Sequence, residues 1–318
     1  MTGMRTTFSR MNGTALVTAL LVVALASTAA AAMLKQQHLD IRRASNVFNA
    51  DQAGLYAQSA EAWVMQVLWR DQQASKQDSL AEAWATLREP IDIEDGQLLV
   101  QVEDLQGRFN LNNLLDKEGR PNRAEQERFQ RLLALLELDT ALVFPVLDWI
   151  DSDINASFPR GAEDNEYLRD PPAHRTGNAP FASSSELLLV KGIGSAEYAR
   201  LEPYVSALPA PVAINVNTAP AIILAASIEG MDLAEAQAFV QARPANGYED
   251  VDAFQNEPLL AGRKTVGLGV RSDYFAIRVT VSLDRHQSTL TTLVRRGSGD
   301  MNGGNETIRV LRRSRVEL

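Results

Sequence analysis

Close to its start the chain carries a long apolar run without a charged residue, from Thr14 to Leu34. A run of this length and composition is long enough to cross a bilayer as an α-helix. Arg5 and Arg10 precede the run, and Lys35 is the first charged residue after it. Positive charge on the leading side favours an N-terminus in the cytoplasm and a C-terminal bulk on the other side of the membrane. A single-pass membrane protein is therefore predicted.

A secretory signal peptide would begin in the same way, and the small residues Ala29 to Ala32 would then provide its cleavage site. Removal of the run would release a secreted protein without an anchor. Gly13 stands directly before the run. Processing at this glycine would keep the run on the mature chain, and this anchored form is the interpretation favoured here.

The composition narrows the classes of protein that remain. The 318 residues include 45% hydrophobic residues, enough for at least one sizeable core. The chain has no cysteine, which excludes disulfides and thiolate metal sites. Its formal net charge of -9 argues against nucleic acid as the main partner, because phosphate binding needs a basic surface.

Helical periodicity marks most of the chain. Apolar residues recur at helical spacing from His38 to about Arg88, and Pro90 ends the pattern. The anchor is therefore predicted to run into a long amphipathic helix. Further helical segments are predicted over residues 123–150, 184–206 and 218–243.

Strand patterns lie on both sides of this helical block. Gln97–Asp104 is predicted to form a strand, and a turn at Gln106 and Gly107 predicts a hairpin with Arg108–Leu111. Further strands are predicted over residues 274–281, 289–294 and 307–310. The simplest arrangement joins all of these strands in one antiparallel sheet, with the helical block as an insertion.

An acidic loop is the first candidate binding site. Carboxylates and amides crowd Asp148–Asn155 and Gly161–Tyr167, with only Arg160 between them. Such a cluster repels itself unless water solvates it or a cation binds, and hard oxygen ligands suit calcium. An EF-hand is improbable, since Ala156 stands at the position of the turn glycine and Glu163 comes one residue late. A solvated acidic loop is the alternative.

Two glycine-containing turns are a second candidate, because Leu189–Leu201 and the segment that follows Ile214–Pro220 look like helix-hairpin-helix units. In nucleic-acid binders such turns offer backbone N–H groups to a phosphate. The basic residues here, Lys191, Arg200 and Arg243, are scattered among acids. The acids are Glu186, Glu197, Glu202, Glu229, Asp232 and Glu235. A compact helical scaffold is favoured over nucleic-acid binding, which remains the alternative.

Nothing in the sequence favours catalysis. The three histidines, His38, His174 and His286, lie in separate segments, and no serine occupies a nucleophile-elbow sequence. Asp151 and Glu163 would offer the paired carboxylates of a glycosidase, yet no cleft is indicated around them. The chain is predicted not to be an enzyme.

The start of the chain resembles the type IV pilin and pseudopilin superfamily. Asn12 and Gly13 resemble the end of a prepilin leader, and Thr14 the first residue of the mature chain. Most members carry Glu at the position of Thr18, where it neutralises the amine of an adjoining subunit within the bilayer. Absence of this Glu is the mark of the K-type minor pseudopilin of type II secretion systems.

Three internal segments carry the same resemblance in the same order. They are Asp-Trp-Ile-Asp-x-Asp from Asp148, Gly-Ala-Glu-Asp from Gly161, and Asn-x-Asn-Thr-Ala-Pro from Asn215. In the third segment Thr218 is predicted to cap the helix that Pro220 opens. The chain therefore looks like a member of the general secretion pathway protein K family over nearly its whole length.

The resemblance implies site residues and partners. Prepilin peptidase would cleave between Gly13 and Thr14. The resemblance also implies structural calcium bound in the acidic loop, with candidate ligands Asp151, Asp153, Glu163 and Asp164. Implied partners are the I-type and J-type minor pseudopilins, other pseudopilins, prepilin peptidase and the bacterial inner membrane, with secreted cargo and the secretin as further candidates. The C-terminal domain would lie in the periplasm, at the tip of the pseudopilus.

The expected fold class is α+β. It is a pseudopilin fold, with a long N-terminal hydrophobic helix and an antiparallel sheet, interrupted by a large all-helical inserted domain of SAM-like or helix-hairpin-helix-like type. The expected boundaries are a leader at 1–13, a membrane helix at 14–34, the pseudopilin helix and first strands at 35–112, the insert at 113–270 and the closing strands at 271–318. Besides the tip pseudopilin, a helix-hairpin-helix nucleic-acid binder and a calcium-dependent secreted binding protein remain open.

Overall fold

The computed structural model describes residues 12–169, 171–284, 286–297 and 307–315. Most of the expected leader, residues 1–11, lies outside this part of the chain. The chain divides into two compact units, one ending at Gly54 and the other running from Leu55 to Leu318.

The first unit is the leading part of one helix, α1 (Asn12–Ala74). Every side chain from Thr14 to Phe48 is exposed, although the run to Leu34 is almost entirely apolar. An apolar surface of this size is not stable in water and has to be covered by lipid or by other helices. Among the described residues, this is the one helix long and apolar enough to cross a membrane.

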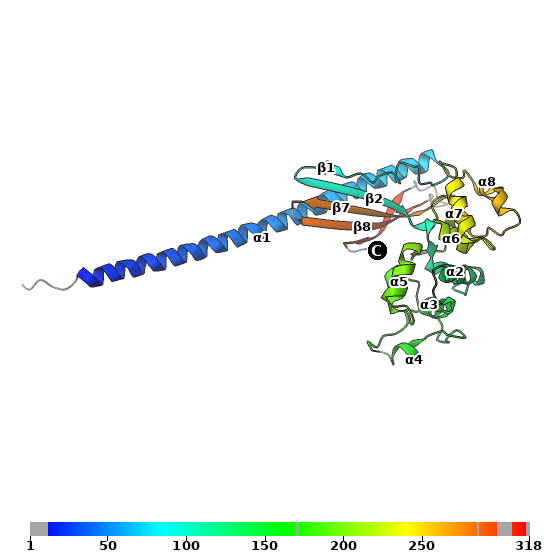
Figure 1. Ribbon diagram of the computed structural model, residues 1–318, viewed down its shortest axis with the longest axis horizontal. Coiled ribbons are helices and arrows are strands. Elements are labelled where there is room, and N and C mark those ends of the chain that lie inside the picture. Colours follow the sequence, from blue (N-terminus) through cyan, green and yellow to red (C-terminus); the bar gives the residue numbers. More distant parts are fainter. Residues whose placement is uncertain (1–11, 170, 285, 298–306, 316–318) are drawn as a thin grey trace, which may run out of the picture. The chain divides into compact units, whose positions relative to one another are not determined.

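The second unit is built around an antiparallel sheet of strand order β1-β2-β7-β8-β9 (Figure 1). Its strands are β1 (Ile91–Ile93), β2 (Gly96–Asp104), β7 (Tyr274–Leu283), β8 (His286–Arg296) and β9 (Ile308–Ser314). The central pair is β2 and β7, in register from Gly96 opposite Leu283 to Asp104 opposite Phe275. Two strands that are far apart in sequence thus hold the middle of the sheet, and the chain between them is an insertion.

The later part of α1 lies against one face of this sheet. Ala57, Ala60, Val64 and Leu68 recur at helical spacing and are buried. The helix is also tied to the sheet by charge, since Glu61 accepts hydrogen bonds from Arg313 of β9, the shortest at 2.9 Å. Burial of the apolar stripe therefore fixes this part of α1 on the sheet.

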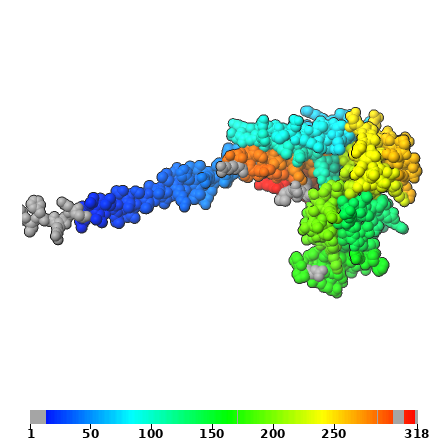
Figure 2. All heavy atoms as spheres, viewed as in Figure 1, coloured from blue at the N-terminus to red at the C-terminus, as the bar shows by residue number. Residues whose placement is uncertain are grey.

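The insertion has its own hydrophobic core. Its helices are α2 (Arg123–Leu135), α3 (Val143–Ile150), α4 (Asp164–Tyr167), α5 (Ser195–Leu201), α6 (Ala221–Ser227), α7 (Leu233–Ala242) and α8 (Val251–Gln255). Short 3-10 helices join them: η1 (Leu105–Gly107), η2 (Leu111–Leu114), η3 (Thr140–Leu142), η4 (Ser184–Leu189), η5 (Glu202–Tyr204) and η6 (Pro258–Leu260). Phe109 stacks on Phe129 at 5.2 Å between ring centroids, and Phe239 packs edge-on against Phe254. In Figure 2 the green and yellow atoms of the insertion lie beside the orange atoms of the sheet.

Two short parallel ladders qualify the expectation of an all-helical insertion. β3 (Phe109–Asn110) pairs with β4 (Val205–Ser206), and β5 (Ile214–Asn215) pairs with β6 (Leu268–Gly269). The fold class otherwise stands as predicted: a long apolar helix, an antiparallel sheet and a mostly helical insertion.

The predicted hairpin between Gln97–Asp104 and Arg108–Leu111 is wrong. β2 pairs instead with β1, through a turn at which Asp95 takes a positive φ of 62°. After β2 the side chain of Asp104 accepts a 2.8 Å hydrogen bond from Gln106 N and starts a 3-10 turn. This turn directs the chain into the insertion rather than back along the sheet.

Two predicted helices are also shorter than expected. α1 ends at Ala74 rather than near Arg88, because Asp78 is drawn into a buried ion pair described below and cannot continue the helix. The segment over 123–150 splits into α2 and α3, where Glu137 takes a positive φ of 54° and Asp139 caps the next turn. Long-range contacts and local caps, rather than apolar spacing, decide where these helices end.

A buried arginine joins three parts of the second unit. The Arg296 guanidinium of β8 is 2% exposed and pairs with Asp71 of α1 at 3.1 Å and with Asp78. It also donates a 2.7 Å hydrogen bond to the carbonyl of Ser272 and lies 4.6 Å from the ring centroid of Phe275. One cation therefore holds the end of α1, the segment after it and the entry to β7.

Asp104 forms a second buried junction beside the first. Its Oδ2 accepts hydrogen bonds from Thr218 Oγ1 at 2.6 Å, Ser272 Oγ at 2.7 Å and Asn215 Nδ2 at 3.0 Å. Burial raises the pKa of Asp104 to about 6, and the two hydroxyl bonds oppose that rise. Thr218 is therefore not the cap of α6, whose first flanking residue is Pro220; its hydroxyl fastens the insertion to the end of β2.

We expect the variant Arg296→Met to lower the free energy of unfolding by about 3–5 kcal/mol, because it leaves the buried carboxylate of Asp78 and the half-buried carboxylate of Asp71 without a cation. Urea unfolding of the full-length protein in detergent micelles, followed by circular dichroism, measures this loss. Arg309→Met on the neighbouring strand is the matched control, since Arg309 is exposed and its loss should change stability by about 0.5 kcal/mol or less. Equal small losses in both variants would contradict the assigned role of Arg296.

Candidate functional site

The acidic loop lies between α3 and α4, and apolar anchors fix both of its ends. Trp149 and Ile150 at the end of α3 are buried, as are Ala162 and Tyr167 beside α4. Trp149 meets the ring of Tyr167 edge-on at 5.5 Å. The anchors bring the two acidic segments predicted from the sequence together, although the loop between them has little apolar content.

Three of the four predicted ligands come together. Asp151, Asp153 and Glu163 each offer an oxygen within 4.8 Å of the others. Asp151 is 7% exposed and Glu163 is 5% exposed, whereas Asp153 faces solvent. Asp151 Oδ1 and Glu163 Oε1 are buried and have no hydrogen-bond partner among the residues that the structure describes. Buried carboxylate oxygens without a donor are costly, so the geometry suits a bound cation.

The electrostatics of the loop agree with this geometry. Burial, followed by repulsion from Asp153 and Asp148, raises the pKa of Asp151 to about 6. Burial and repulsion from Asp148 raise the pKa of Glu163 to about 7, against a weak opposing hydrogen bond from Thr176. In the metal-free loop Glu163 would be about half protonated near pH 7, whereas Asp151 would be mostly ionised, and a divalent cation would release the protons that remain.

Asp164, the fourth predicted ligand, lies outside the group of three. Its Oδ1 accepts hydrogen bonds from Thr176 N at 3.1 Å and from Thr176 Oγ1 at 3.0 Å, and its Oδ2 lies 3.6 Å from Arg175. Thr176 Oγ1 also lies 3.3 Å from Glu163 Oε2. Asp164 thus positions the threonine that contacts Glu163, an arrangement that spacing along the chain does not reveal.

Asp148 is the acidic residue that sequence reasoning left out of the ligand set. It is fully buried, and its carboxylate accepts a 3.0 Å hydrogen bond from Ser157 N, which folds the loop back on α3. A Cβ on Gly161 would lie 2.1 Å from Asp148 Oδ2, so this position requires glycine. The sequence did contain a signal for the role of Asp148, because this acid stands within the apolar segment Val143–Ile150 and an unpaired charge is rare on a buried helix.

The predicted cleavage junction lies at the start of α1. Gly13 and Thr14 are both within the helix, and residues 1–11 of the leader are outside the described residues. Thr18 Oγ1 donates hydrogen bonds to the carbonyls of Thr14 at 3.1 Å and Ala15 at 3.0 Å. The position that carries Glu in most pilins is thus filled by a neutral hydroxyl that bonds to its own helix.

The glycine-containing turns bind their own acids. Gly194 N, at the start of α5, donates to Glu197 Oε2 at 2.9 Å, and Lys191 pairs with Glu166 at 2.5 Å. Asp232 N at the start of α7 likewise donates to Glu235 Oε2 at 3.0 Å. Carboxylates of the chain therefore occupy the N–H groups that a phosphate would need, and the observed arrangement argues against nucleic-acid binding.

A long N-terminal apolar helix followed by an antiparallel sheet that is completed across a large insertion is the architecture of a pseudopilin. Residues 107–210 and 214–278 match two family models, both described as type II secretion system protein K. The chain belongs to the type II secretion system protein K family and is a minor pseudopilin. This confirms the resemblance drawn from Thr18 and the three internal segments.

Relatives match over nearly the full chain. Type II secretion system protein K of Pseudomonas aeruginosa is 40% identical over 303 residues, covering 91% of this chain and 90% of that protein. Protein K of Klebsiella pneumoniae is 34% identical and covers 86% of this chain and 88% of the relative. Protein K of Aeromonas hydrophila is 32% identical and covers 93% of this chain and 98% of the relative.

A solved structure matches the fold. It is a chain of the GspK-GspI-GspJ complex from the enterotoxigenic Escherichia coli type 2 secretion system, with a TM-score of 0.76 and 29% identity. The match covers 87% of this chain and all of that chain. The sheet and the insertion described here are therefore those of a secretion-system subunit.

Proposed function

We propose that this subunit stands at the tip of the type II secretion pseudopilus, where it assembles with I-type and J-type minor pseudopilins and starts or caps the filament for export of folded proteins across the outer membrane. The similar Escherichia coli chain, solved together with GspI and GspJ, is the observation that carries this proposal. Coverage of that whole chain supports the same mode of assembly here.

The start of α1 supplies the anchor in this proposal. Prepilin peptidase cleaves between Gly13 and Thr14, the run to Leu34 holds the subunit in the bacterial inner membrane, and Leu55–Leu318 lies in the periplasm. The exposed apolar surface of the helix supports membrane insertion. Small residues over Ala26–Ala32 permit close contact with the helices of partner subunits once the complex leaves the bilayer.

Thr18 supports a terminal position. In a filament of subunits that carry Glu, each carboxylate neutralises the amine of a neighbour in a medium where unpaired charge is costly. Thr18 has no charge, and its hydroxyl is bonded within its own helix. A subunit without this carboxylate is not suited to positions inside the filament, and the large insertion between β2 and β7 also favours a single copy.

The role is structural rather than catalytic in this proposal. His174 Nδ1 lies 2.9 Å from the carbonyl oxygen of Pro172 and its Nε2 lies 3.2 Å from that of Leu189, so the ring donates to the backbone of the loop rather than serving a substrate. The paired acids Asp151 and Glu163 face each other inside the loop. Secreted cargo, the secretin and other pseudopilins are further proposed partners. The subunit would recognise them through surfaces that bind a partner without catalysing a reaction.

Co-expression with the I-type and J-type subunits of the same system tests the assembly. The tagged full-length protein, extracted in detergent, is expected to elute with both partners as one equimolar complex in size-exclusion chromatography. The matched control is a major pseudopilin tagged in the same way, which should not replace it. An I–J pair that forms while this subunit elutes alone would contradict the proposed assembly.

Calcium bound by the acidic loop is the second part of the proposal. Asp151, Asp153 and Glu163 would hold the ion, and Asp164 would act through Thr176. The ion would supply the positive charge that the two buried oxygens of Asp151 and Glu163 need, and would fix a loop that its apolar anchors hold only at the ends. The role would be structural, with no part in a reaction.

The variant Glu163→Gln is expected to change stability in opposite directions with and without calcium. The folded protein without metal retains a proton on Glu163 that the unfolded chain loses between about pH 4.5 and about pH 7, so stability falls across this window. With chelator at about pH 8 the variant should therefore melt at a higher temperature than wild type. With saturating calcium, wild type should gain about 5–10 °C and the variant much less.

Differential scanning fluorimetry of the full-length protein measures both arms. Glu166→Gln is the matched control, since Glu166 is close in sequence, is only half-buried and pairs with Lys191; it should retain the calcium response. A wild-type protein whose melting temperature is the same with calcium and with chelator would rule out the metal site.

A further inference from the structure

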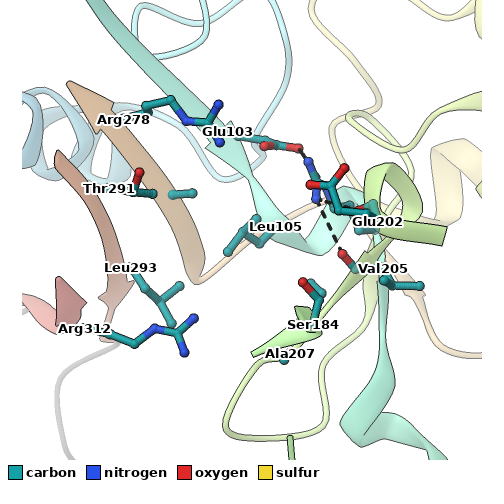
Figure 3. A pocket seen from close by; sticks show the side chains of 13 residues that line it. Glu103, Leu105, Ser184, Glu202, Val205, Ala207, Arg278, Thr291, Leu293 and Arg312 are labelled. Atoms are coloured by element: carbon teal, nitrogen blue, oxygen red, sulfur yellow. Dashed lines mark hydrogen bonds and ion pairs between the residues drawn. The ribbon is translucent and has the colours of Figure 1, made fainter. Parts of the chain in front are cut away.

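A groove separates the sheet from the insertion on the side of the sheet away from α1. One wall is formed by β2, β7, β8 and β9, and the other by η1, η4, η5 and β4 (Figure 3). The open part of the groove has a volume of about 500 Å³ and contains Arg88 and Gln101. It leads past Glu103 and Arg278 to a narrow end of about 50 Å³. The open part is as large as typical ligand sites.

The narrow end holds polar atoms without partners. Ser206 is 4% exposed and Thr291 is 2% exposed, and both side chains line this end. Ser206 Oγ, Thr291 Oγ1 and Arg312 Nε have no hydrogen-bond partner within the described parts of the chain. Buried polar groups are nearly always bonded, and a cavity of this size holds only a few atoms. The narrow end is therefore built to receive an acceptor, either water or a group of another molecule.

The sheet register places these groups on one face. Thr291 of β8 lies opposite Arg278 of β7, and Leu293 of β8 lies opposite Arg312 of β9. Residues directly opposite each other in an antiparallel pair project to the same side. Figure 3 shows Thr291, Leu293 and Arg312 along this side, with Ser184 on the facing wall.

The groove is basic in an acidic protein. Four arginines and two glutamates line it, an excess of two positive charges, whereas the whole chain has a net charge of -9. Glu103 is paired with Arg108 at 2.5 Å, so it does not oppose a bound anion. Arg312 is held by a hydrogen bond to the carbonyl of Ala182, and its Nε has no hydrogen-bond partner among the described residues. Planar guanidinium groups and hydroxyls match a carboxylate better than a cation or an apolar group.

We propose that this groove binds an acidic side chain on an extended segment of another protein. The carboxylate enters the narrow end and accepts hydrogen bonds from Arg312, Ser206 and Thr291, while the backbone of the segment lies in the open part beside Arg88 and Arg278. The choice of a protein rather than a metabolite rests on the proposed function, in which this subunit works by contact with other proteins.

The probe is a rhodamine-labelled hexapeptide with two central glutamates, an acetylated N-terminus and an amidated C-terminus. Its binding to the full-length protein in nonionic detergent is followed by fluorescence anisotropy, with chelator present so that no cation in the acidic loop recruits it. Saturable binding is expected for this peptide and not for the same peptide with glutamines. Because the protein repels acidic peptides as a whole, such binding requires a local site.

Variants locate the site. Arg312→Gln is expected to weaken binding about ten-fold, and Ser206→Ala and Thr291→Val about three-fold each, as expected for lost hydrogen bonds to a carboxylate. Arg309→Gln is the matched control, because it removes the same charge from the same strand but lies outside the groove. It should leave binding unchanged. Thr291→Val keeps the side-chain shape and carries the test if Arg312→Gln fails to fold.

Several results would overturn the proposal. The first is that folded wild type does not bind the peptide, as expected if water alone fills the narrow end. The second is that the glutamine peptide binds equally well. The third is that Arg309→Gln and Arg312→Gln weaken binding equally. Tighter binding of a glutamine peptide with a free C-terminus would assign the site to a chain end instead. Assembly with the I-type and J-type subunits is measured separately, so a protein that assembles but does not bind the peptide contradicts only this inference.

Discussion

The pairing of β2 with β7 across the insertion is the constraint on which the rest of the second unit depends. Pairing β2 with β7 closes a long loop, the insertion, and this closure costs conformational entropy. The two strands stabilise the sheet little until both are held in place. The buried Arg296 with Asp71 and Asp78, and Asp104 with its three donors, fix the two strand ends at one point. These junctions hold α1, the sheet and the insertion to one another.

The second unit contains two regions of opposite charge. The acidic loop between α3 and α4 brings the carboxylates of Asp151, Asp153 and Glu163 together, and burial with mutual repulsion raises the pKa of Asp151 and Glu163. The groove beside the sheet places arginines and unpaired hydroxyls together. The net charge of the chain predicts neither region, because each region consists of buried groups that lack a nearby partner of opposite charge or a hydrogen-bond partner. The two proposals, a cation in the loop and a carboxylate in the groove, follow from this contrast.

Much of the fold could be predicted because it rests on local patterns. The apolar run to Leu34, the strand over 274–281 and the acidic segments after Asp148 and before Tyr167 are each visible as periodicity or composition. The predicted ends of helices were wrong where a residue distant in sequence determines the end. Asp78 ends α1 through Arg296, and Thr218 serves Asp104 rather than a helix cap. Neither partner can be read from spacing along the chain.

The candidate site shows the same limit. Asp151, Asp153 and Glu163 were chosen by resemblance and do meet, whereas Asp164 turns to Thr176, and Asp148 was overlooked as part of an apolar helix. The groove had no signal in the sequence, because its donors come from segments far apart in sequence that only the closed sheet brings together.

The central claim is that the apolar helix remains on the mature subunit as its anchor. Intact mass and N-terminal sequencing of the membrane-extracted protein, expressed with and without a prepilin peptidase, test it most directly. We predict a mature chain that begins at Thr14 only when the peptidase is present. A chain that begins near Met33 in both cases would show removal of the run as a signal peptide and would contradict the anchored minor pseudopilin.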